Sequence, residues 1–408
     1  MGRTAVLIAD KLADWCIADL KESGCEVHYQ PELKDDALTN AIRDTSCRVL
    51  VVRSTKVKAE MLRASVDLAL IVRAGAGYNN IDVEEASRRS IMVANCPGKN
   101  AIAVAELAMG LMLAVDRRIA DNVVDLRSGL WKKKEYAKAR GLKGRTLGIC
   151  GMGEIGKAVM RRAQAFKMNI AGWSRSLTPE VAEQYGIQYC ETIGELASVS
   201  DVFSIHLAAN KATEKIIDQS VIDKLRPGSY VINTSRAEVI DQSALEHAIT
   251  TKNLRAGLDV FEHEPGASDT EFADNIVNLE GVVYGTHHIG ASTDQAQDEI
   301  ARETVRIITH FVRNGEVCNC VNLREDAPAH YVLVVRHKNK PGVLAHTLNK
   351  ISHSGINVEE MQNIICAGSD AACAQIVLDG PLDEATQLAI RDGNEHVLAV
   401  TISENIDA

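Results

Sequence analysis

The sequence has few aromatic residues and no recognisable cysteine framework. Phe, Trp and Tyr together make up 4% of the 408 residues, which argues against base-stacking platforms and aromatic cages. The ten cysteines are scattered, and no two of them form a C-x-x-C pair. The nearest two, Cys318 and Cys320, lack the four-ligand set that a structural zinc site needs. We therefore expect reduced thiols and no metal site.

Long hydrophobic runs and an excess of positive charge are also missing. The most apolar helix-like stretch, Ala101 to Val115, contains Glu106 and is shorter than the roughly 20 residues that span a bilayer. The first apolar run ends at Asp10 and lacks the cleavage region of a signal peptide. The net charge of −10 argues against a general nucleic-acid binder. We expect a cytoplasmic protein with no membrane or nucleic-acid partner.

Short apolar runs alternate with longer mixed segments over most of the chain. Such runs are typical of strands buried on both faces of a parallel sheet, with helices between them. One series ends near Pro97 and a second begins at Thr146, so we predict an α/β protein with two doubly wound, Rossmann-like domains. The predicted boundaries are 1–98 with 290–320 for a discontinuous substrate-binding domain, and 99–289 for a dinucleotide-binding domain.

The C-terminal part of the chain has a different character. A polar connector, Glu316 to Ala329, precedes it. Residues 331–403 then read as strand, helix, strand, strand, helix and strand, with Pro341 near the start of the first helix and Gly355 just past its end. This βαββαβ order predicts a ferredoxin-like third domain at 329–408.

A glycine-rich turn, Gly151-Met-Gly153-Glu154-Ile155-Gly156, directly follows an apolar strand and opens a helix. The turn needs a glycine, the backbone must approach a pyrophosphate closely, and the helix must pack tightly on the strand. The amides at the helix N-terminus favour the negative charge. We therefore predict that these residues bind a dinucleotide.

The next strand ends at Trp173-Ser174-Arg175, where NAD-selective sites usually carry an acid for the ribose diol. That acid is missing here. Ser174 and Arg175 suit a 2′-phosphate, which they would hold by charge-assisted hydrogen bonds. The cofactor prediction is therefore NAD(P), with NADP favoured over NAD. The alternative is that Arg175 is a solvated surface residue.

Three polar clusters lie where later strands of the second series should end. They contain Arg236, Glu264 and His288. Ligands of doubly wound sheets bind at the carboxyl ends of strands, so we expect the clusters to converge on one cleft. An arginine can fork onto a carboxylate and a carbonyl. A histidine can exchange a proton with a hydroxyl, and a glutamate can orient its ring.

Together with the glycine turn, these clusters resemble the D-isomer-specific 2-hydroxyacid dehydrogenase family over nearly all of the first 320 residues. The resemblance implies that Arg236 binds the α-carboxylate and carbonyl oxygen, and that His288, paired with Glu264, is the general acid/base. It also assigns Thr234 and Asp259 to the cofactor site. His287 stands where the family usually has proline, and the histidine directly before Ile-Gly is the one that matches.

The C-terminal segment from His337 to Leu344, followed by Gly355-Ile-Asn357, resembles the ligand-binding face of an ACT domain, a module that senses small amino acids. This combination is similar to the phosphoglycerate dehydrogenase branch of the family. It implies that His337, Asn339 and Asn357 bind the feedback inhibitor serine at a dimer interface. The alternative is a dimerisation module without an effector.

In that branch the substrate is 3-phosphoglycerate, which is oxidised at C2 to 3-phosphohydroxypyruvate in the first step of serine biosynthesis. Arg53 is our first choice for the phosphate and Lys56 the second, on a loop one residue shorter than the family's. A second loop resembles the one whose backbone amides meet the carboxylate. The full substrate prediction is Arg53, Ser54, Lys56, Ala76, Gly77 and Asn79.

The segment from residue 127 to 145 has a local net charge of +7 and includes Trp131. It either contributes to the site of a neighbouring subunit or is a solvated connector. The Ala101 helix is apolar well beyond one stripe, which predicts a dimer interface. Pairing of the third domain would then give a homotetramer, with a homodimer as the alternative.

Two other functions remain open. One is a glyoxylate or hydroxypyruvate reductase, which the Ser174-Arg175 pair favours. The other is a non-catalytic, nucleotide-sensing scaffold that shares the fold.

Overall fold

The computed structural model describes residues 3–265, 271–279, 282–324 and 331–404. The chain forms two compact units, Met1–Asn322 and Leu323–Ala408. Residues 325–329 of the predicted connector lie outside the described part. Each unit is taken here by itself.

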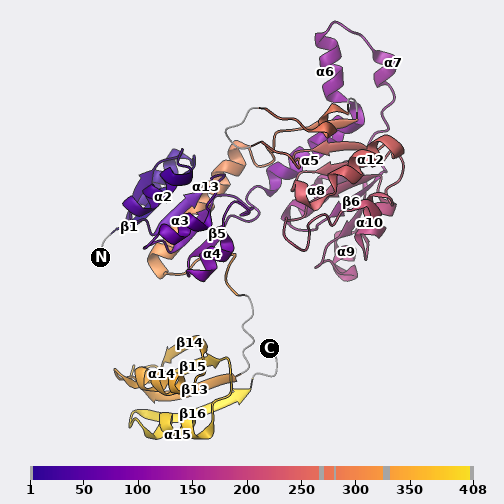
Figure 1. Cartoon of the computed structure of the whole chain (residues 1–408). Helices are drawn as coiled ribbons and strands as arrows, with labels where there is room; N and C mark the ends of the chain where they lie inside the picture. The colour runs from indigo at the N-terminus through magenta and orange to yellow at the C-terminus, as the bar shows by residue number, and fades with distance from the viewer. Residues whose placement is uncertain (1–2, 266–270, 280–281, 325–330, 405–408) are drawn as a thin grey trace. The chain divides into compact units, whose positions relative to one another are not determined.

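Five parallel strands form the first sheet of the larger unit, in the order β2-β1-β3-β4-β5 (Figure 1). One apolar face packs against α13, a helix that follows the second sheet in the chain, through Ile300, Ile307 and Phe311. Strand β2 lies at the sheet edge and does not read as an apolar run, because Glu26 and His28 interrupt it. The elements are β1 (Thr4–Ile8), α1 (Asp14–Glu22), β2 (Cys25–Tyr29), α2 (Asp35–Asp44), β3 (Val49–Val52), α3 (Ala59–Ala64), β4 (Leu70–Arg73), α4 (Val83–Arg88), β5 (Met92–Asn95) and α13 (Asp294–Asn314).

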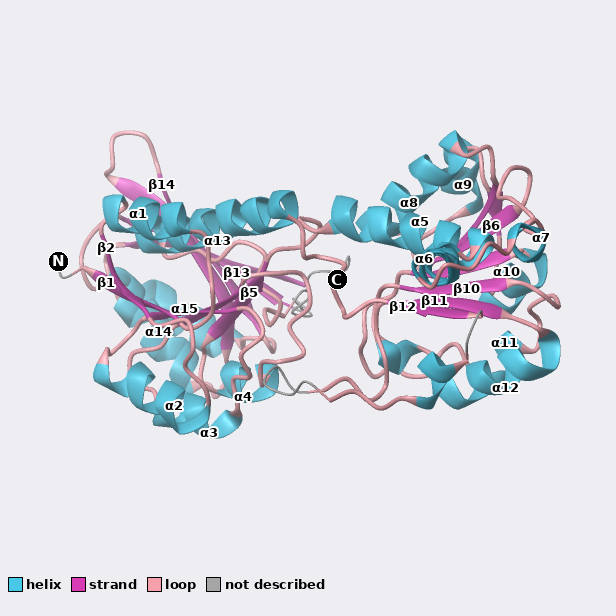
Figure 2. Cartoon of the chain, turned by 90° about the horizontal axis from the view of Figure 1, so that it is seen from above, coloured by secondary structure: helices cyan, strands magenta, loops and turns pink. Residues whose placement is uncertain are grey.

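Seven parallel strands form the second sheet, in the order β12-β11-β10-β9-β6-β7-β8. Helices cover both of its faces, with α5 and α8 on one side and α11 and α12 on the other (Figure 2). The elements are α5 (Ala101–Arg117), β6 (Thr146–Cys150), α8 (Glu154–Ala165), β7 (Asn169–Trp173), α9 (Pro179–Tyr185), β8 (Gln188–Tyr189), α10 (Ile193–Val199), β9 (Val202–Ile205), α11 (Gln219–Ile222), β10 (Tyr230–Asn233), α12 (Gln242–Lys252), β11 (Arg255–Leu258) and β12 (Val283–Gly285), with short 3₁₀ turns at Ala237–Val239 and Asn275–Asn278.

Exposed apolar side chains near this sheet lie on α6 (Ile119–Arg127) and at the start of α5, where Ile102 is 56% exposed. Helix α5 buries ten of its residues inside the chain, and the interface predicted for it stays a prediction. Helix α6 has no buried residue, and its Val124 is 62% exposed. With α7 (Lys133–Tyr136) it forms an arm that projects from the sheet (Figure 1). On this arm Trp131 is 81% exposed.

The smaller unit has the predicted βαββαβ order and an antiparallel sheet arranged β14-β15-β13-β16. This is the arrangement of the ferredoxin-like fold. Leu333 and Val335 of the sheet form a core with Val343 and Ile351 of the first helix. The elements are β13 (Tyr331–Lys338), α14 (Val343–His353), β14 (Val358–Ile365), β15 (Ala371–Leu378), α15 (Glu384–Asp392) and β16 (Val397–Glu404).

In the described ranges, no helix combines the length and the apolar character that crossing a bilayer requires.

Candidate active site

The three glycines of the turn after β6 differ in what a side chain would meet. Gly151 has φ +104°, and a Cβ there would lie 2.4 Å from the His206 carbonyl oxygen. A Cβ at Gly156 would lie 2.0 Å from the Gly151 carbonyl oxygen, whereas at Gly153 nothing lies within 4 Å. Helix α8 begins at Glu154 without a side-chain cap. The turn is therefore tight on two sides and open at its middle glycine, which fits a pyrophosphate at the helix N-terminus.

The tip of β7 lies beside this turn, because the Gly151 amide donates to the Trp173 carbonyl at 2.8 Å. Ser174 is half-buried and Arg175 is exposed. Thr234, which follows β10 of the same sheet, buries its hydroxyl oxygen without a hydrogen-bond partner in the described structure. The side chains present fit a dinucleotide, and Ser174, Arg175 and Thr234 are free to contact it.

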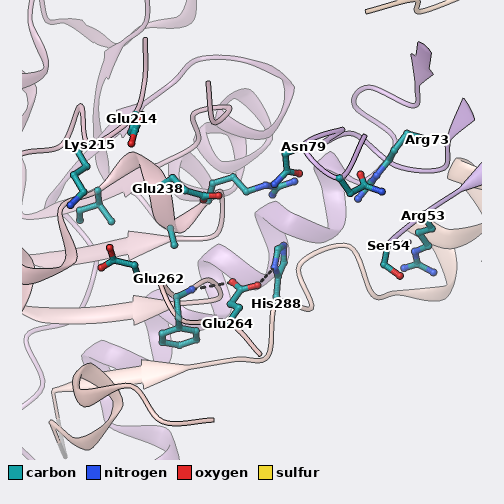
Figure 3. A pocket seen from close by; sticks show the side chains of 15 residues that line it. Arg53, Ser54, Arg73, Asn79, Glu214, Lys215, Glu238, Glu262, Glu264 and His288 are labelled. Carbon is teal, nitrogen blue, oxygen red and sulfur yellow. Dashed lines mark hydrogen bonds and ion pairs between the residues drawn. The ribbon is translucent and has the colours of Figure 1, made fainter. Parts of the chain in front are cut away.

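His288 and Glu264 form the pair that the resemblance implies. His288 Nδ1 lies 2.8 Å from Glu264 Oε2, and Glu264 Oε1 accepts a hydrogen bond from the Phe261 amide at 3.0 Å (Figure 3). Burial alone would raise the pKa of Glu264. The hydrogen bond and charge of His288, the Phe261 amide and the charge of Arg236 outweigh it, so the pKa lies below the usual value. The carboxylate therefore stays ionised, and its bond to Nδ1 leaves Nε2 to exchange a proton with a substrate.

Asp259 anchors the segment that carries His288. The Asp259 side chain is buried, and it accepts hydrogen bonds from the Thr286 hydroxyl at 2.6 Å and from the Ile289 and Gly290 amides at 2.8 Å. His288 itself has φ +52°, a left-handed conformation that a side chain seldom adopts unless its surroundings hold it. The carboxylate assigned to the cofactor site is thus bonded to a side chain before the histidine and to two backbone amides after it.

A pocket of about 400 Å³ opens beside the pair. It is lined from both sheets, with Arg53, Ser54, Arg73 and Asn79 on one side and Glu214, Lys215, Glu238 and Glu262 on the other (Figure 3). The remaining lining residues are Asn80, Arg236, Ala237, Ile240, Phe261, Glu264 and His288. The pocket therefore has a cationic end and an acidic end, with the histidine pair at its wall.

Not all of the predicted substrate residues reach this pocket. Arg53, Ser54 and Asn79 line it, but Lys56 and Ala76 do not. Gly77 does not line it either, yet a Cβ at Gly77 would lie 2.1 Å from Arg236 Nη2. The turn that carries Arg53 is held by Asp10, whose Oδ2 accepts a hydrogen bond from the Arg53 amide at 2.6 Å. Burial lowers the pKa of the Arg53 guanidinium.

Arg73 and Lys215 are basic residues of the pocket that the sequence reasoning did not select. Burial, and then the charges of Arg236 and Arg53, lower the pKa of Arg73 to about 10. The residue opens the segment 73–80, and the resemblance drew attention to that segment's backbone rather than to its first side chain. Lys215 lies between the end of β9 and the start of α11, away from the strand end and from any motif, so no sequence signal pointed to it.

In the smaller unit the three predicted effector residues have separate partners. His337 is 2% exposed, with Nδ1 2.8 Å from the Lys338 carbonyl and Nε2 3.1 Å from Asn363 Oδ1. The side-chain amide of Asn339 donates to the Ser369 carbonyl, and that of Asn357 to Glu359. Within one chain these side chains therefore share no hydrogen-bond partner among the described residues.

Comparisons with known proteins agree on one family. Residues 109–290 match the model of the D-isomer specific 2-hydroxyacid dehydrogenase, NAD binding domain. The chain is 38% identical to the D-3-phosphoglycerate dehydrogenase of Methanocaldococcus jannaschii over 320 residues, which are 78% of this chain and 59% of that protein. It thus spans less than two thirds of that relative.

Two reductases are similar as well. The hydroxypyruvate reductase of Thermotoga maritima is 42% identical over 278 residues, 68% of this chain and 88% of the reductase. The crystal structure of the NADPH-dependent glyoxylate/hydroxypyruvate reductase of Sinorhizobium meliloti, in complex with NADP and malonate, aligns with a TM-score of 0.68 at 27% identity. That alignment covers 80% of this chain and 100% of the reductase.

Proposed function

The chain belongs to the D-isomer-specific 2-hydroxyacid dehydrogenase family of NAD(P)-dependent oxidoreductases, and from this premise we propose that it oxidises 3-phosphoglycerate at C2 to 3-phosphohydroxypyruvate. The observation that carries the proposal is the Glu264–His288 pair at the wall of a pocket with a cationic end. A 2-hydroxy acid with a second anionic group needs a proton acceptor beside such a surface. The similarity to the archaeal phosphoglycerate dehydrogenase supports the same substrate.

The proposed roles follow from the contacts. Bound NAD(P)⁺ supplies the hydride acceptor for C2. Arg236 forks onto the carboxylate and the C2 oxygen, and stabilises the charge on that oxygen as the carbonyl forms. His288 Nε2 takes the hydroxyl proton, and Glu264 holds the ring through Nδ1 as it becomes charged. Asp259 is a positioning residue, because its bonds hold the backbone beside His288.

Steady-state kinetics with 3-phosphoglycerate and each of NAD⁺ and NADP⁺ test the proposal. Turnover that disappears in Arg236→Ala and His288→Ala supports it. A wild-type protein that reduces glyoxylate or hydroxypyruvate far better than it oxidises 3-phosphoglycerate would favour the second candidate, a reductase, for which the similarity to the Thermotoga enzyme speaks. A wild type without any turnover would favour the nucleotide-sensing scaffold.

For the cofactor we propose a preference for NADP. The tip of β7 offers Ser174 and the exposed Arg175 but no carboxylate, and a guanidinium suits a 2′-phosphate. Ser174→Asp together with Arg175→Ala should shift the preference toward NAD⁺, measured as the ratio of kcat/KM for the two cofactors.

The smaller unit, in this proposal, is an ACT domain that responds to serine. Its βαββαβ order and sheet arrangement support the assignment. Because His337, Asn339 and Asn357 have separate partners within one chain, a serine site built from them requires a second copy or a local rearrangement. Millimolar serine should inhibit turnover, and Asn339→Ala or Asn357→Ala should relieve that inhibition.

We also propose a homo-oligomer whose interface includes the arm formed by α6 and α7. Its exposed apolar side chains include Val124, Leu126 and Trp131, and apolar patches of this kind mark interaction surfaces. Sedimentation of the wild type and of Val124→Asp with Leu126→Asp tests this. Loss of the larger species in the double variant supports the interface, and an unchanged species argues against it.

A further inference from the structure

Glu264 is carried by a turn, residues 261–265, that follows β11 and belongs to no helix or strand. Within this Glu264 turn, Oε1 of the carboxylate accepts a hydrogen bond from the Phe261 amide at 3.0 Å. Its Oε2 lies 2.8 Å from His288 Nδ1 (Figure 3). The distance between the carboxylate and the imidazole therefore depends on what holds the turn.

The middle of the Glu264 turn is held by Gln242, the first residue of α12. The Glu262 amide donates a hydrogen bond to Gln242 Oε1 at 3.2 Å, and Gln242 Nε2 donates one to Asp274 Oδ1 at 2.8 Å. Gln242 is 8% exposed. The side-chain amide of a glutamine combines the acceptor that a backbone amide needs with the donor that a carboxylate needs. Gln242 thus bridges the turn to Asp274.

Asp274 is the fixed end of this bridge. It is 5% exposed, and its Oδ1 also accepts a hydrogen bond from the amide of Ile276, a residue of the core. Its Oδ2 has no hydrogen-bond partner in the part of the chain that the structure describes, and His263 Nδ1, on the Glu264 turn, lies 3.6 Å from it. A buried carboxylate is costly unless it is hydrogen-bonded. Gln242 therefore satisfies a buried anion and a turn amide together.

An aromatic contact joins the same two segments. The rings of Phe261 and Phe272 meet edge to face, with their centroids 5.1 Å apart. A Cβ at Gly285 would lie 2.9 Å from Phe261 Cζ, so the Phe261 ring also lies against the end of β12, the strand that leads to His288. The start of the Glu264 turn is thus fixed by packing, whereas its middle is fixed by the hydrogen bonds of Gln242.

We infer that Gln242 is a positioning residue for the Glu264–His288 pair and that Asp274 orients its side chain. Neither Gln242 nor Asp274 lines the pocket, so both act through the Glu264 turn. The inference rests on the proposed function in one respect, namely that His288 accepts the hydroxyl proton of a 2-hydroxy acid. The ring is charged once it has taken that proton, and the carboxylate is then needed most. A displaced turn should therefore lower kcat more than it changes KM.

Steady-state kinetics of Gln242→Met test the inference. Methionine is similar in length and removes both the acceptor and the donor. With 3-phosphoglycerate, kcat should fall about 10- to 100-fold, as expected for a small misplacement of a catalytic group. The KM of the substrate and the Kd of the reduced cofactor should stay within about twofold, because the pocket and the cofactor turn are untouched. Denaturant unfolding of the same variant reports any loss of stability separately.

Gln219→Met is the matched control. Gln219 is the first residue of α11, and its Nε2 donates a hydrogen bond to Asp223 Oδ1 at the same 2.8 Å. Both residues are exposed, and neither lines the pocket. This variant loses the same kind of bond without displacing the Glu264 turn, so its kcat should equal that of the wild type.

An exchange of the two bridging groups provides a second test. Gln242→Glu places a carboxylate against that of Asp274, and kcat should fall because the two charges repel. Adding Asp274→Asn returns one amide and one carboxylate to the bridge and keeps an acceptor for the Glu262 amide. The double variant should therefore turn over faster than Gln242→Glu alone. Its recovery should be incomplete, because Glu246 Oε1, 3.2 Å from Gln242 Nε2, would face the new carboxylate.

Three results would overturn the inference. The first is a Gln242→Met variant with the kcat of the wild type, whatever its stability. The second is a loss of kcat/KM that comes from KM alone, which would mean that the turn shapes the pocket and does not position the pair. The third is a double variant no faster than Gln242→Glu.

The proposed function can fail separately. If the wild type reduces hydroxypyruvate but does not oxidise 3-phosphoglycerate, the variants are compared with hydroxypyruvate, and a fall in kcat at constant KM still supports the inference. If the wild type oxidises 3-phosphoglycerate and Gln242→Met keeps its kcat, the function stands and the inference fails. A wild type without any turnover would overturn both.

Discussion

The pocket of the larger unit and the predicted effector face of the smaller unit differ in how their buried polar groups are satisfied. Around the pocket and the cofactor turn, Arg73 Nε, Thr234 Oγ1 and His206 Nδ1 are buried without a partner in the described residues. On the effector face, His337 has a partner at each ring nitrogen. Native proteins leave few buried polar atoms unpaired.

This difference suggests two classes of residue: polar groups that are unpaired and available to a ligand, and polar groups that already form hydrogen bonds within the fold. Removing an unpaired group should impair binding or turnover without lowering the stability of the protein. Removing one partner of a satisfied pair should lower stability, because the other partner is left buried without a hydrogen bond. Four substitutions test whether this distinction holds.

The largest effect is expected at His288. In His288→Asn the proton acceptor is lost, and kcat should fall by about 10³-fold, within the range typical of general acid/base residues. Thermal unfolding should remain close to that of the wild type, because the side chain is 44% exposed. A large fall in the unfolding temperature with little loss of turnover would show that His288 stabilises the fold and is not needed for catalysis.

Asp259 combines both properties: its carboxylate is hydrogen-bonded within the fold, and we expect it to be needed for turnover. Its carboxylate is satisfied by three hydrogen bonds, yet these bonds hold the catalytic segment. Asp259→Asn replaces one acceptor oxygen by a donor that faces a backbone amide. We expect kcat to fall by about 10²-fold, since small displacements of a catalytic group are costly, together with a lower unfolding temperature. A variant that loses stability and keeps kcat would show a purely structural role.

These cases show how far the sequence reasoning reaches. The apolar runs predicted parallel strands, because strands covered on both faces need no polar alternation. The spacing of Gly151, Gly153 and Gly156 predicted the cofactor turn. Strand β2 was not predicted, since an edge strand tolerates Glu26 and His28. The interface predicted for α5 stays a prediction, because composition does not tell a helix covered by its own chain from one that is also covered by a partner.

The sequence likewise predicted only part of the candidate site. Motif spacing led to Arg236, Glu264 and His288, and the structure brings all three to one pocket. It did not lead to the side chain of Arg73, whose position depends on the missing side chain of Gly75. Lys56 was selected for its charge, but its direction from the loop is a property of the folded backbone.

Asn363 tests the comparison from the satisfied side. Its side-chain oxygen lies 3.1 Å from Nε2 of the buried His337. Asn363→Ala would leave that nitrogen without its partner, which should cost about 1 to 3 kcal/mol in the free energy of unfolding. Denaturant unfolding of the full chain measures this. The KM values for substrate and cofactor should not change, and a change in either would mean that the effector face is coupled to the pocket.

Thr234→Val is the smallest and sharpest test, because valine has nearly the same shape as threonine and lacks the hydroxyl. The wild-type hydroxyl oxygen is buried without a partner, so its removal should leave the unfolding temperature unchanged or slightly higher. If the cofactor supplies the missing partner, the Kd of NADP⁺ or NAD⁺ should rise by about three- to tenfold, as expected for one neutral hydrogen bond. Fluorescence titration with the reduced cofactor measures the change. A variant that is less stable and binds the cofactor as tightly as the wild type would place Thr234 with the satisfied groups, and unpaired atoms would then no longer distinguish the two regions.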